Sequence, residues 1–211
     1  ILDPLLTYGM PPALTAATGV DALTHAIESC VSRKATKLTI DFSLRAAGRL
    51  ARFLPVAFAS PDDAEARREC LLGSLEAGIA FTNSSVALVH GMARPLGAKF
   101  GIPHGVSNAV LLEAIMRFSL PDAPERYARL AEAMGAVPAG TPLETARAGL
   151  GIVSRLVREL HIPRLRDLLS REALDAQLDA MVREAVASGS PANNPRPASP
   201  EEIASLYGEA F

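Results

Sequence analysis

The sequence has few of the features that mark disulfide-stapled, nucleic-acid-binding or membrane-spanning proteins. Cys30 and Cys70 are its only cysteines, too few for a disulfide scaffold, so we expect reduced thiols. With 21 basic and 23 acidic residues, the net charge is −2, and no basic excess is available for nucleic acid or anionic membrane. No apolar run approaches the ~18 residues of a membrane span. We therefore expect no nucleic-acid or membrane partner and a cytoplasmic location.

Two further absences concern the architecture. Runs of β-branched residues are scarce, whereas alanine and leucine, which favour helices, dominate. Neither a GxGxxG loop nor a Walker A loop occurs, so a nucleotide-binding half is absent from these residues. The sequence opens at Ile1 without an initiator Met or a signal peptide, which suggests a piece of a longer protein. We predict one all-α, multi-helix bundle-like domain over residues 1–211.

Capping patterns and prolines divide the chain into predicted helices. Thr141 and Ser199 each begin a capping-box pattern, and Ser60 followed by Pro61 suggests a cap with a proline at the first helical position. The segment 190–197 predicts an extended or turning loop, because its three prolines do not suit a helix interior. The predicted helices cover about 11–17, 19–32, 37–54, 61–81, 85–100, 105–118, 123–135, 142–161, 171–188 and 199–208.

Residues with metal-binding chemistry are few. His25 follows Asp21 by four residues, so on a helix both side chains share one face. His90 and His104 are 14 residues apart in glycine-containing settings, where one can lie on a helix and the other at the start of the next. Together the four residues could offer three imidazoles and one carboxylate to a divalent ion such as Fe²⁺ or Zn²⁺.

Spacing alone leaves other roles open for these residues. The segment Thr18–Asp21 is also typical of a helix N-cap followed by an acid in the first turn. His90 and His104 could each be an ordinary core or surface histidine. His161 ends a predicted helix, where an imidazolium suits the helix dipole, and we leave it out of the site. Cys30 suits a small buried apolar role.

Several segments occur in the order of one known family, as a linker, two metal motifs and a closing segment. They are Leu2–Thr7, Met10–Pro12, Gly19–Glu28 (GVDALTHAIE), His90–Ala98 (HGMARPLGA), Pro103–Ala109 (PHGVSNA) and Asn194–Pro197. In these segments the chain resembles the C-terminal half of the iron-containing (group III) alcohol dehydrogenases, and the resemblance extends over residues 1–211. The combined motifs, with their 14-residue histidine spacing, make it specific.

The resemblance implies that Asp21, His25, His90 and His104 bind Fe²⁺ or Zn²⁺ in the helical C-terminal domain of a dehydroquinate-synthase-like protein. A Rossmann-like N-terminal half would bind NAD or NADP, with the active site in the cleft between the halves. The implied function is a dehydrogenase that oxidises small alcohols to aldehydes or ketones, and the reverse, as a homodimer or larger assembly. The resemblance also implies that this half alone is inactive. The residues of this chain that would contact the nucleotide stay unknown.

One position departs from the family's pattern. Many members carry a histidine four residues after the first histidine of the second motif, near the nicotinamide, where this chain has Arg94. A guanidinium stays charged and cannot serve as a neutral acid or base. Either the proton relay uses water and the ribose hydroxyls, or Arg94 holds an anionic group of substrate or cofactor, or Arg94 pairs with a nearby carboxylate.

Two other functions remain compatible with the sequence. One is a stand-alone helical interaction or oligomerisation module derived from such an enzyme, with a structural metal or none. The other is a metal-dependent hydrolase with the same four ligands. Hydrolysis would need a general base beside the metal, and Glu28 is the only acid near a ligand motif.

Overall fold

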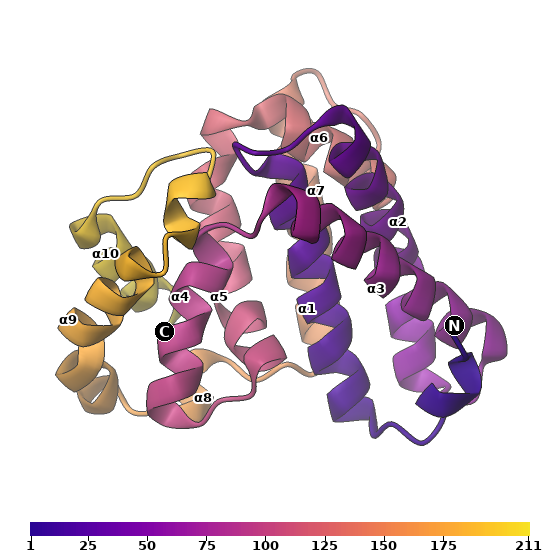
Figure 1. Ribbon diagram of the computed structural model, residues 1–211, viewed down its shortest axis with the longest axis horizontal. Helices are drawn as coiled ribbons and strands as arrows, with labels where there is room; N and C mark the ends of the chain where they lie inside the picture. The colour runs from indigo at the N-terminus through magenta and orange to yellow at the C-terminus, as the bar shows by residue number, and fades with distance from the viewer.

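The computed structural model describes all residues from 1 to 211 and contains helices and no strands, which confirms the all-α prediction. Short connections join the α-helices, and two of the three 3₁₀ turns lie within these connections while the first precedes α1 (Figure 1). The α-helices are α1 Pro12–Val31, α2 Lys37–Ala59, α3 Ala64–Ser84, α4 Leu88–Phe100, α5 His104–Ser119, α6 Pro124–Ala133, α7 Pro142–Glu159, α8 Leu165–Leu168, α9 Arg171–Ala187 and α10 Pro200–Ala210. The 3₁₀ turns are η1 Pro4–Thr7, η2 Leu120–Asp122 and η3 Ser190–Asn193.

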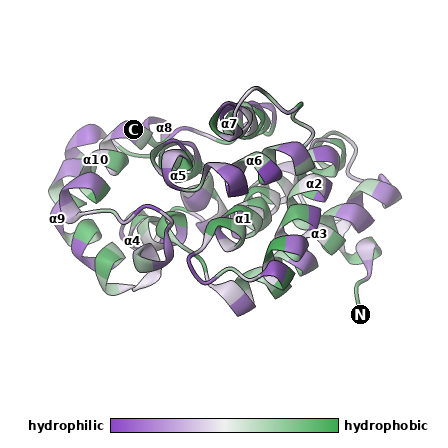
Figure 2. Ribbon diagram, turned by 90° about the horizontal axis from the view of Figure 1, so that it is seen from above, coloured by the Kyte–Doolittle hydropathy of each residue, from purple (hydrophilic) through white to green (hydrophobic).

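Helix α1 runs through the middle of the molecule. It contacts α2 and α3 on one side and α5 on another, and α4 also reaches it (Figures 1 and 2). Nearly all of its residues from Thr15 to Val31 are buried or half-buried. A helix enclosed in this way must be apolar or small on most of its surface, and alanines such as Ala16, Ala22 and Ala26 let the neighbouring helices come close. The polar groups that α1 does carry are therefore held in fixed surroundings.

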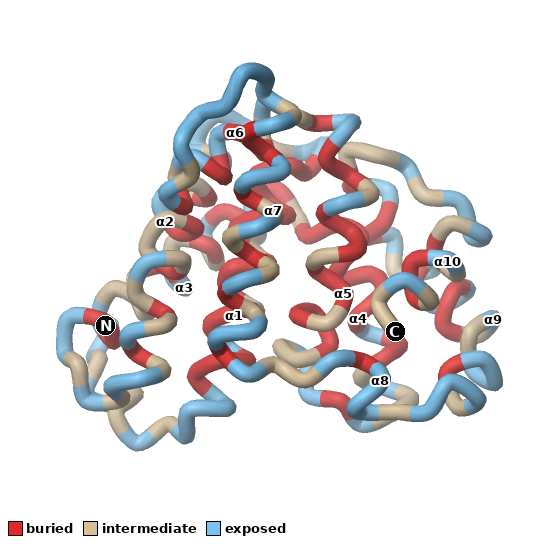
Figure 3. The backbone as a smooth tube through the Cα atoms, turned by 180° about the vertical axis from the view of Figure 1, so that it is seen from behind, coloured by how far each residue is buried: buried red, intermediate tan, exposed pale blue.

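The remaining helices form two groups around α1. Helices α2, α3, α6 and α7 contact one another on one side, and α4, α5, α9 and α10 do so on the other. One continuous hydrophobic cluster runs through both groups, and the buried backbone is concentrated in α1, α4 and α5 (Figure 3). The buried Tyr207 hydroxyl donates to the Met92 carbonyl at 2.7 Å and ties α10 to α4. The hydrophobic cluster thus packs against α1 from both groups of helices.

The predicted break between helices 11–17 and 19–32 is wrong, because both belong to α1. The Thr18 hydroxyl donates to the Leu14 carbonyl at 2.8 Å inside the helix and does not cap it, so Asp21 is not a first-turn acid. A Cβ at Gly19 would lie 2.3 Å from the Leu54 side chain of α2. The close packing of α1 against α2 therefore explains why a glycine stands at position 19, and the glycine does not mark the end of a helix.

Other helix boundaries also differ from the prediction. Helix α2 continues past residue 54 to Ala59 with Pro55 inside it, and this last stretch still buries Ala57. Helix α3 begins at Ala64, so Pro61 lies outside it, because Asp63 is the cap and accepts a hydrogen bond from the Ala66 N–H at 2.8 Å. The short helix α8 was not predicted. It is too short to carry a periodic pattern.

The capping residues of two later helices are confirmed. The Thr141 hydroxyl accepts from the Glu144 N–H, and the Ser199 hydroxyl accepts from the Glu202 N–H, both at 3.2 Å. Residues 190–197 contain one 3₁₀ turn and no α-helix, as the prolines predict. No single helix reaches the length and apolar composition of a membrane span, although α3 and α4, bent by 103° at their junction, satisfy both criteria as a pair.

Helix α5 approaches α1 closely at its first turn. A Cβ at Gly105 would lie 2.2 Å from the Ala17 carbonyl oxygen and 2.7 Å from the carbonyl carbon. These are backbone atoms of a central helix, so neither side can yield. Glycine at this position therefore sets how near His104, the residue before it, stands to α1.

Replacement of this glycine should loosen the junction between α1 and α5. We expect Gly105→Ala to lower the free energy of unfolding by about 1–3 kcal/mol, because the added methyl overpacks the contact. Gly151→Ala is the matched control, since Gly151 lies inside α7 with no atom within 4 Å of its Cβ position. It should be neutral or stabilising by up to about 1 kcal/mol. Equal denaturant midpoints and slopes for Gly105→Ala and wild type would contradict the prediction.

Candidate metal centre

Three of the predicted ligands come together from three different helices. Asp21 in α1, His90 in α4 and His104 at the start of α5 each place one ligand atom within 4.8 Å of the others. The Oδ1 atom of Asp21 lies 3.6 Å from Nε2 of His90 and 3.6 Å from Nε2 of His104. His90 is buried, whereas half of the His104 side chain is exposed. The group therefore opens towards solvent on the side of His104.

His25 lies beside this group but does not converge with it. Its Nδ1 is 3.9 Å from Oδ2 of Asp21, one helical turn earlier in α1. The His25 ring centroid is 4.3 Å from that of His90 and, in a stacked arrangement, 4.3 Å from that of Phe81. His25 thus contacts Asp21 and His90 of the ligand group directly. Its role as a fourth ligand stays a prediction.

Asn108 shows that the converging atoms suit a cation. Its Nδ2 lies 2.5 Å from Asp21 Oδ1, 3.2 Å from His90 Nε2 and 3.1 Å from His104 Nε2, so three acceptors surround one electropositive amide group. The Oδ1 of Asn108 is buried and has no hydrogen-bond partner. Carboxylate oxygen and imidazole nitrogen are donors that Zn²⁺ and Fe²⁺ accept. The residues present therefore fit a divalent metal ion.

The sequence interpretation missed Asn108, although a signal was available. Asn108 follows His104 by four residues in α5, which places both side chains on one face of the helix. An asparagine is not a usual ligand of Fe²⁺ or Zn²⁺, and the search for imidazoles and carboxylates passed over it.

Glu28 orients His90 and also caps α4. Its carboxylate is buried, with Oε2 2.6 Å from Nδ1 of His90 and Oε1 accepting from the Val89 N–H at 2.6 Å. A His90 ring that donates through Nδ1 has Nε2 free for a metal. Helix α4 has no side-chain cap of its own, so Glu28 satisfies one of its free N–H groups and places a negative charge at its N-terminus.

This arrangement removes the general base that the hydrolase interpretation required. Both oxygens of Glu28 are engaged by α4, and the residue is 2% exposed. Glu28 therefore acts on His90 and not on a water molecule. Its position seven residues after Asp21, two turns along one face of a helix, was the available signal for this supporting role.

Burial and nearby charge act in opposite directions on the pKa values of the site. Burial raises the pKa of Asp21, but hydrogen bonding with His90 and Asn108 and the adjacent histidines leave it below its ordinary value. Burial lowers the pKa of His25 to about 4, so this imidazole is neutral near pH 7. Burial would also lower the pKa of His90, but the carboxylates of Asp21 and Glu28 outweigh it and raise that pKa to about 9.

The remaining residues that the sequence singled out lie apart from the ligand group. Arg94 is exposed on α4, and its Nη1 donates to the Ser190 hydroxyl at 3.2 Å. Within residues 1–211 this hydroxyl is its partner, and the choice among the alternatives expected for Arg94 stays a prediction. His161 follows the end of α7 with a φ of 54° and is outside the site. Cys30 is fully buried, and burial raises its pKa to about 12, which fits a small apolar role.

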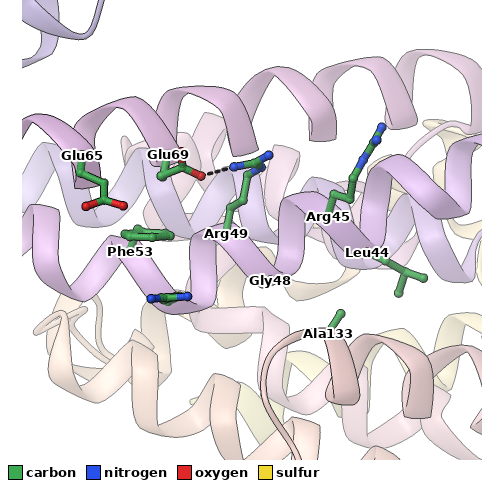
Figure 4. A pocket seen from close by; sticks show the side chains of 9 residues that line it. Leu44, Arg45, Gly48, Arg49, Phe53, Glu65, Glu69 and Ala133 are labelled. Atoms are coloured by element: carbon green, nitrogen blue, oxygen red, sulfur yellow. Dashed lines mark hydrogen bonds and ion pairs between the residues drawn. The ribbon is translucent and has the colours of Figure 1, made fainter.

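A wide surface pocket lies between α2, α3 and α6, away from the ligand group. It encloses about 610 Å³ and is lined by Arg45, Arg49, Phe53 and Glu69 among others (Figure 4). None of the candidate ligands lines it. Arg49, one of the arginines that line it, is paired with Glu69 and Glu76. We do not assign it to the metal centre.

Comparisons with known proteins match the whole chain to one family. The model of the C-terminal part of the Fe-containing alcohol dehydrogenase family matches residues 15–211. The 1,3-propanediol dehydrogenase of Klebsiella pneumoniae is 41% identical over 213 aligned positions, and the lactaldehyde reductase of Escherichia coli K12 is 42% identical. Each alignment covers 100% of this chain and 54% of the relative. The chain thus spans about half the length of these curated relatives.

Solved structures give the same result for the fold. The crystal structure of a 1,3-propanediol oxidoreductase superposes with a TM-score of 0.95 at 40% identity, over 99% of this chain and 55% of that one. An alcohol dehydrogenase from Oenococcus oeni superposes with a TM-score of 0.94 at 32% identity, over 99% and 54% of the two chains. Both likenesses extend along nearly all of the helices described above.

Loss of the Glu28 carboxylate should weaken metal binding without any change to the ligands. We expect Glu28→Gln to raise the dissociation constant for Zn²⁺ about 10- to 100-fold, because the partner that orients His90 loses its charge. Competition with a fluorescent chelator measures this directly. Glu113→Gln is the control, since the Glu113 side chain is partly exposed and pairs with Arg117 on α5, away from the ligand group. Equal Zn²⁺ affinities for wild type and Glu28→Gln would show that the hydrogen bond has no such role.

Proposed function

The chain belongs to the Fe-containing alcohol dehydrogenase family, and from this premise we propose that it is the metal-bearing part of an NAD(P)-dependent alcohol dehydrogenase. The proposed reaction is the oxidation of a small alcohol to an aldehyde or ketone, and the reverse. The observation that carries the proposal is the convergence of Asp21, His90 and His104 from three helices on one cation-sized position. The named relatives act on propanediol and lactaldehyde, so we propose small diols and hydroxyaldehydes as substrates.

We propose Asp21, His25, His90 and His104 as the residues that hold Fe²⁺ or Zn²⁺. A divalent ion bound there supplies Lewis acidity toward the oxygen of the substrate. Asp21 contributes the negative charge, and Glu28 keeps Nε2 of the buried His90 aimed at the ion. His104 is half exposed, so the substrate oxygen would enter from its side. The neutral His25, stacked on Phe81, borders the same space.

Nucleotide binding requires a part of the protein outside these residues. The sequence contains no glycine-rich phosphate loop, and the helices form no βαβ unit that could present one. We therefore propose that NAD or NADP is held by an adjoining nucleotide-binding part and that residues 1–211 alone have little or no dehydrogenase activity. From family membership we also propose a homodimer or larger assembly and a cytoplasmic location.

The proposal is tested by the activity and metal content of the full-length protein that carries these residues. We expect about one Fe or Zn ion per chain by elemental mass spectrometry, and propanediol-dependent reduction of NAD⁺ or NADP⁺. The double variant Asp21→Ala/His104→Ala should lose the ion and the turnover together. Normal metal content with no nicotinamide-linked turnover of any small alcohol would favour the interaction-module alternative. A metal-free protein in the presence of added Fe²⁺ and Zn²⁺ would contradict the metal site.

We propose that Arg94 binds an anionic group of the substrate or cofactor and does not transfer protons. Its guanidinium is exposed, one turn after His90 in α4, and has a hydroxyl but no carboxylate as partner. Replacement by glutamine should raise the KM for the nicotinamide cofactor or the substrate about 10- to 100-fold, with a smaller effect on kcat, because a charge-assisted hydrogen bond is lost.

Steady-state kinetics separates this role from proton transfer. Lys99→Gln on the same helix is the control, because Lys99 pairs with Glu184 and not with a site residue. An Arg94→Gln variant with both KM values unchanged and a displaced pH profile of kcat would overturn the assignment.

A further inference from the structure

A second cavity lies on another face of α1, between α1, α2, α3 and the first residues of the chain. It encloses about 120 Å³, well above the roughly 10–15 Å³ that a single water molecule needs. None of its lining residues is acidic, and none is a candidate metal ligand. Those that carry the argument are Thr15, Leu50, Leu54, Arg67, Leu71 and Ser74.

Arg67 contributes a buried positive charge to this cavity. The residue is 3% exposed, its Nε donates to the Pro61 carbonyl at 2.7 Å, and its Nη1 donates to the Thr15 hydroxyl at 2.9 Å. Its Nη2 is buried and has no acceptor. Within residues 1–211 its side-chain partners are this carbonyl and this hydroxyl, and no carboxylate forms an ion pair with it. Because a guanidinium cannot be neutralised by deprotonation, a buried one without a counter-charge is strongly unfavourable.

Arg49 provides a comparison with Arg67, because it lies between the same two helices, α2 and α3, and has acidic partners. Arg49 on α2 is partly exposed and is paired with Glu69 of α3 (Figure 4), and it is also paired with Glu76 of the same helix. Arg67, on α3 and far more deeply buried, has only a carbonyl and a hydroxyl. The fold thus compensates the more exposed arginine and leaves the buried one to be compensated by something else.

The free polar hydrogens around the cavity are those of an anion site. The Thr15 hydroxyl accepts from Arg67, so its own hydrogen is available. Ser74 is an exposed residue at the rim of the cavity, and its hydroxyl makes no hydrogen bond within the chain. The hydroxyls of Thr7 and Thr18 donate to backbone carbonyls and point their hydrogens elsewhere. Arg67, Thr15 and Ser74 can therefore donate to one ligand, and nothing acidic opposes it.

We propose that this cavity binds a small organic carboxylate as the counter-ion of Arg67. The carboxylate would accept from Nη2 of Arg67 and from the hydroxyls of Thr15 and Ser74. The other walls are formed by Leu50, Leu54 and Leu71. These apolar walls suit a short alkyl chain better than the fully hydrated surface of inorganic phosphate. The site is independent of the metal centre and of the proposed dehydrogenase reaction.

Thermal unfolding and calorimetric titration of the full protein with sodium propionate test this assignment, with phosphate and chloride as parallel arms in a low-salt zwitterionic buffer. We expect propionate to give a saturable rise in Tm and a binding isotherm. Arg67→Met should abolish both, and Ser74→Ala should weaken binding about tenfold. General salt effects would act on all variants alike. Arg68→Met, which removes a neighbouring exposed arginine of α3, should respond as wild type.

Further variants keep the test decisive. The Asp21→Ala/His104→Ala variant should retain the propionate response, which separates this cavity from carboxylate binding to a metal. If Arg67→Met does not fold, Ser74→Val provides a second test. The larger apolar side chain should obstruct the cavity and abolish binding, and no hydrogen bond within the protein is lost because the Ser74 hydroxyl makes none. An absent or non-saturable response in wild type would overturn the proposal. So would saturable binding of phosphate without binding of propionate, or an equal propionate response in wild type and both cavity variants.

Discussion

The buried carboxylate of Glu28 links the central helix to the metal face of the molecule. It accepts hydrogen bonds from two consecutive residues of α4, the Val89 backbone and the His90 ring. One interaction thereby caps a helix that has no cap of its own, fixes how α4 meets α1, and leaves one nitrogen of His90 free for a cation. A neutral side chain of the same size would bind the Val89 N–H and the His90 ring more weakly, because a helix N-terminus and an imidazole N–H both favour a negatively charged acceptor.

Helix α1 can serve two sites because it is small and apolar almost all round. Asp21 and His25 lie on the face towards α4 and α5, where Gly105 lets α5 come into contact with the α1 backbone. Thr15 lies on the face that borders the cavity of Arg67. Charge is treated differently on the two faces. On the first face the Asp21 carboxylate lies beside imidazole nitrogens that suit a cation. On the second face the Arg67 guanidinium has no acidic partner.

Much of the helical layout was predictable from local chemistry. Thr141 and Ser199 cap the helices they precede, since cap residues act through their own backbone neighbours. The break predicted at Thr18 failed because a threonine hydroxyl can either cap a following helix or donate back to a carbonyl one turn earlier in the same helix, as Thr18 does to Leu14. The end of α2 was missed for a similar reason, since buried contacts beyond Pro55 outweigh the local cost of a proline.

The sequence by itself determined an all-α chain, its family, and Asp21, His25, His90 and His104 as ligand candidates, because composition, caps and motif spacing are local properties. Tertiary structure alone decided which of these atoms converge, and there His25 stands slightly apart from the other three. It also decided that the Glu28 carboxylate binds His90 Nδ1 and that the Asn108 amide lies among the candidate metal-ligand atoms. It decided as well that Arg67 is buried without a counter-charge. Each of these depends on contacts between different helices or on burial by them, and distances of that kind cannot be read from spacing along the chain.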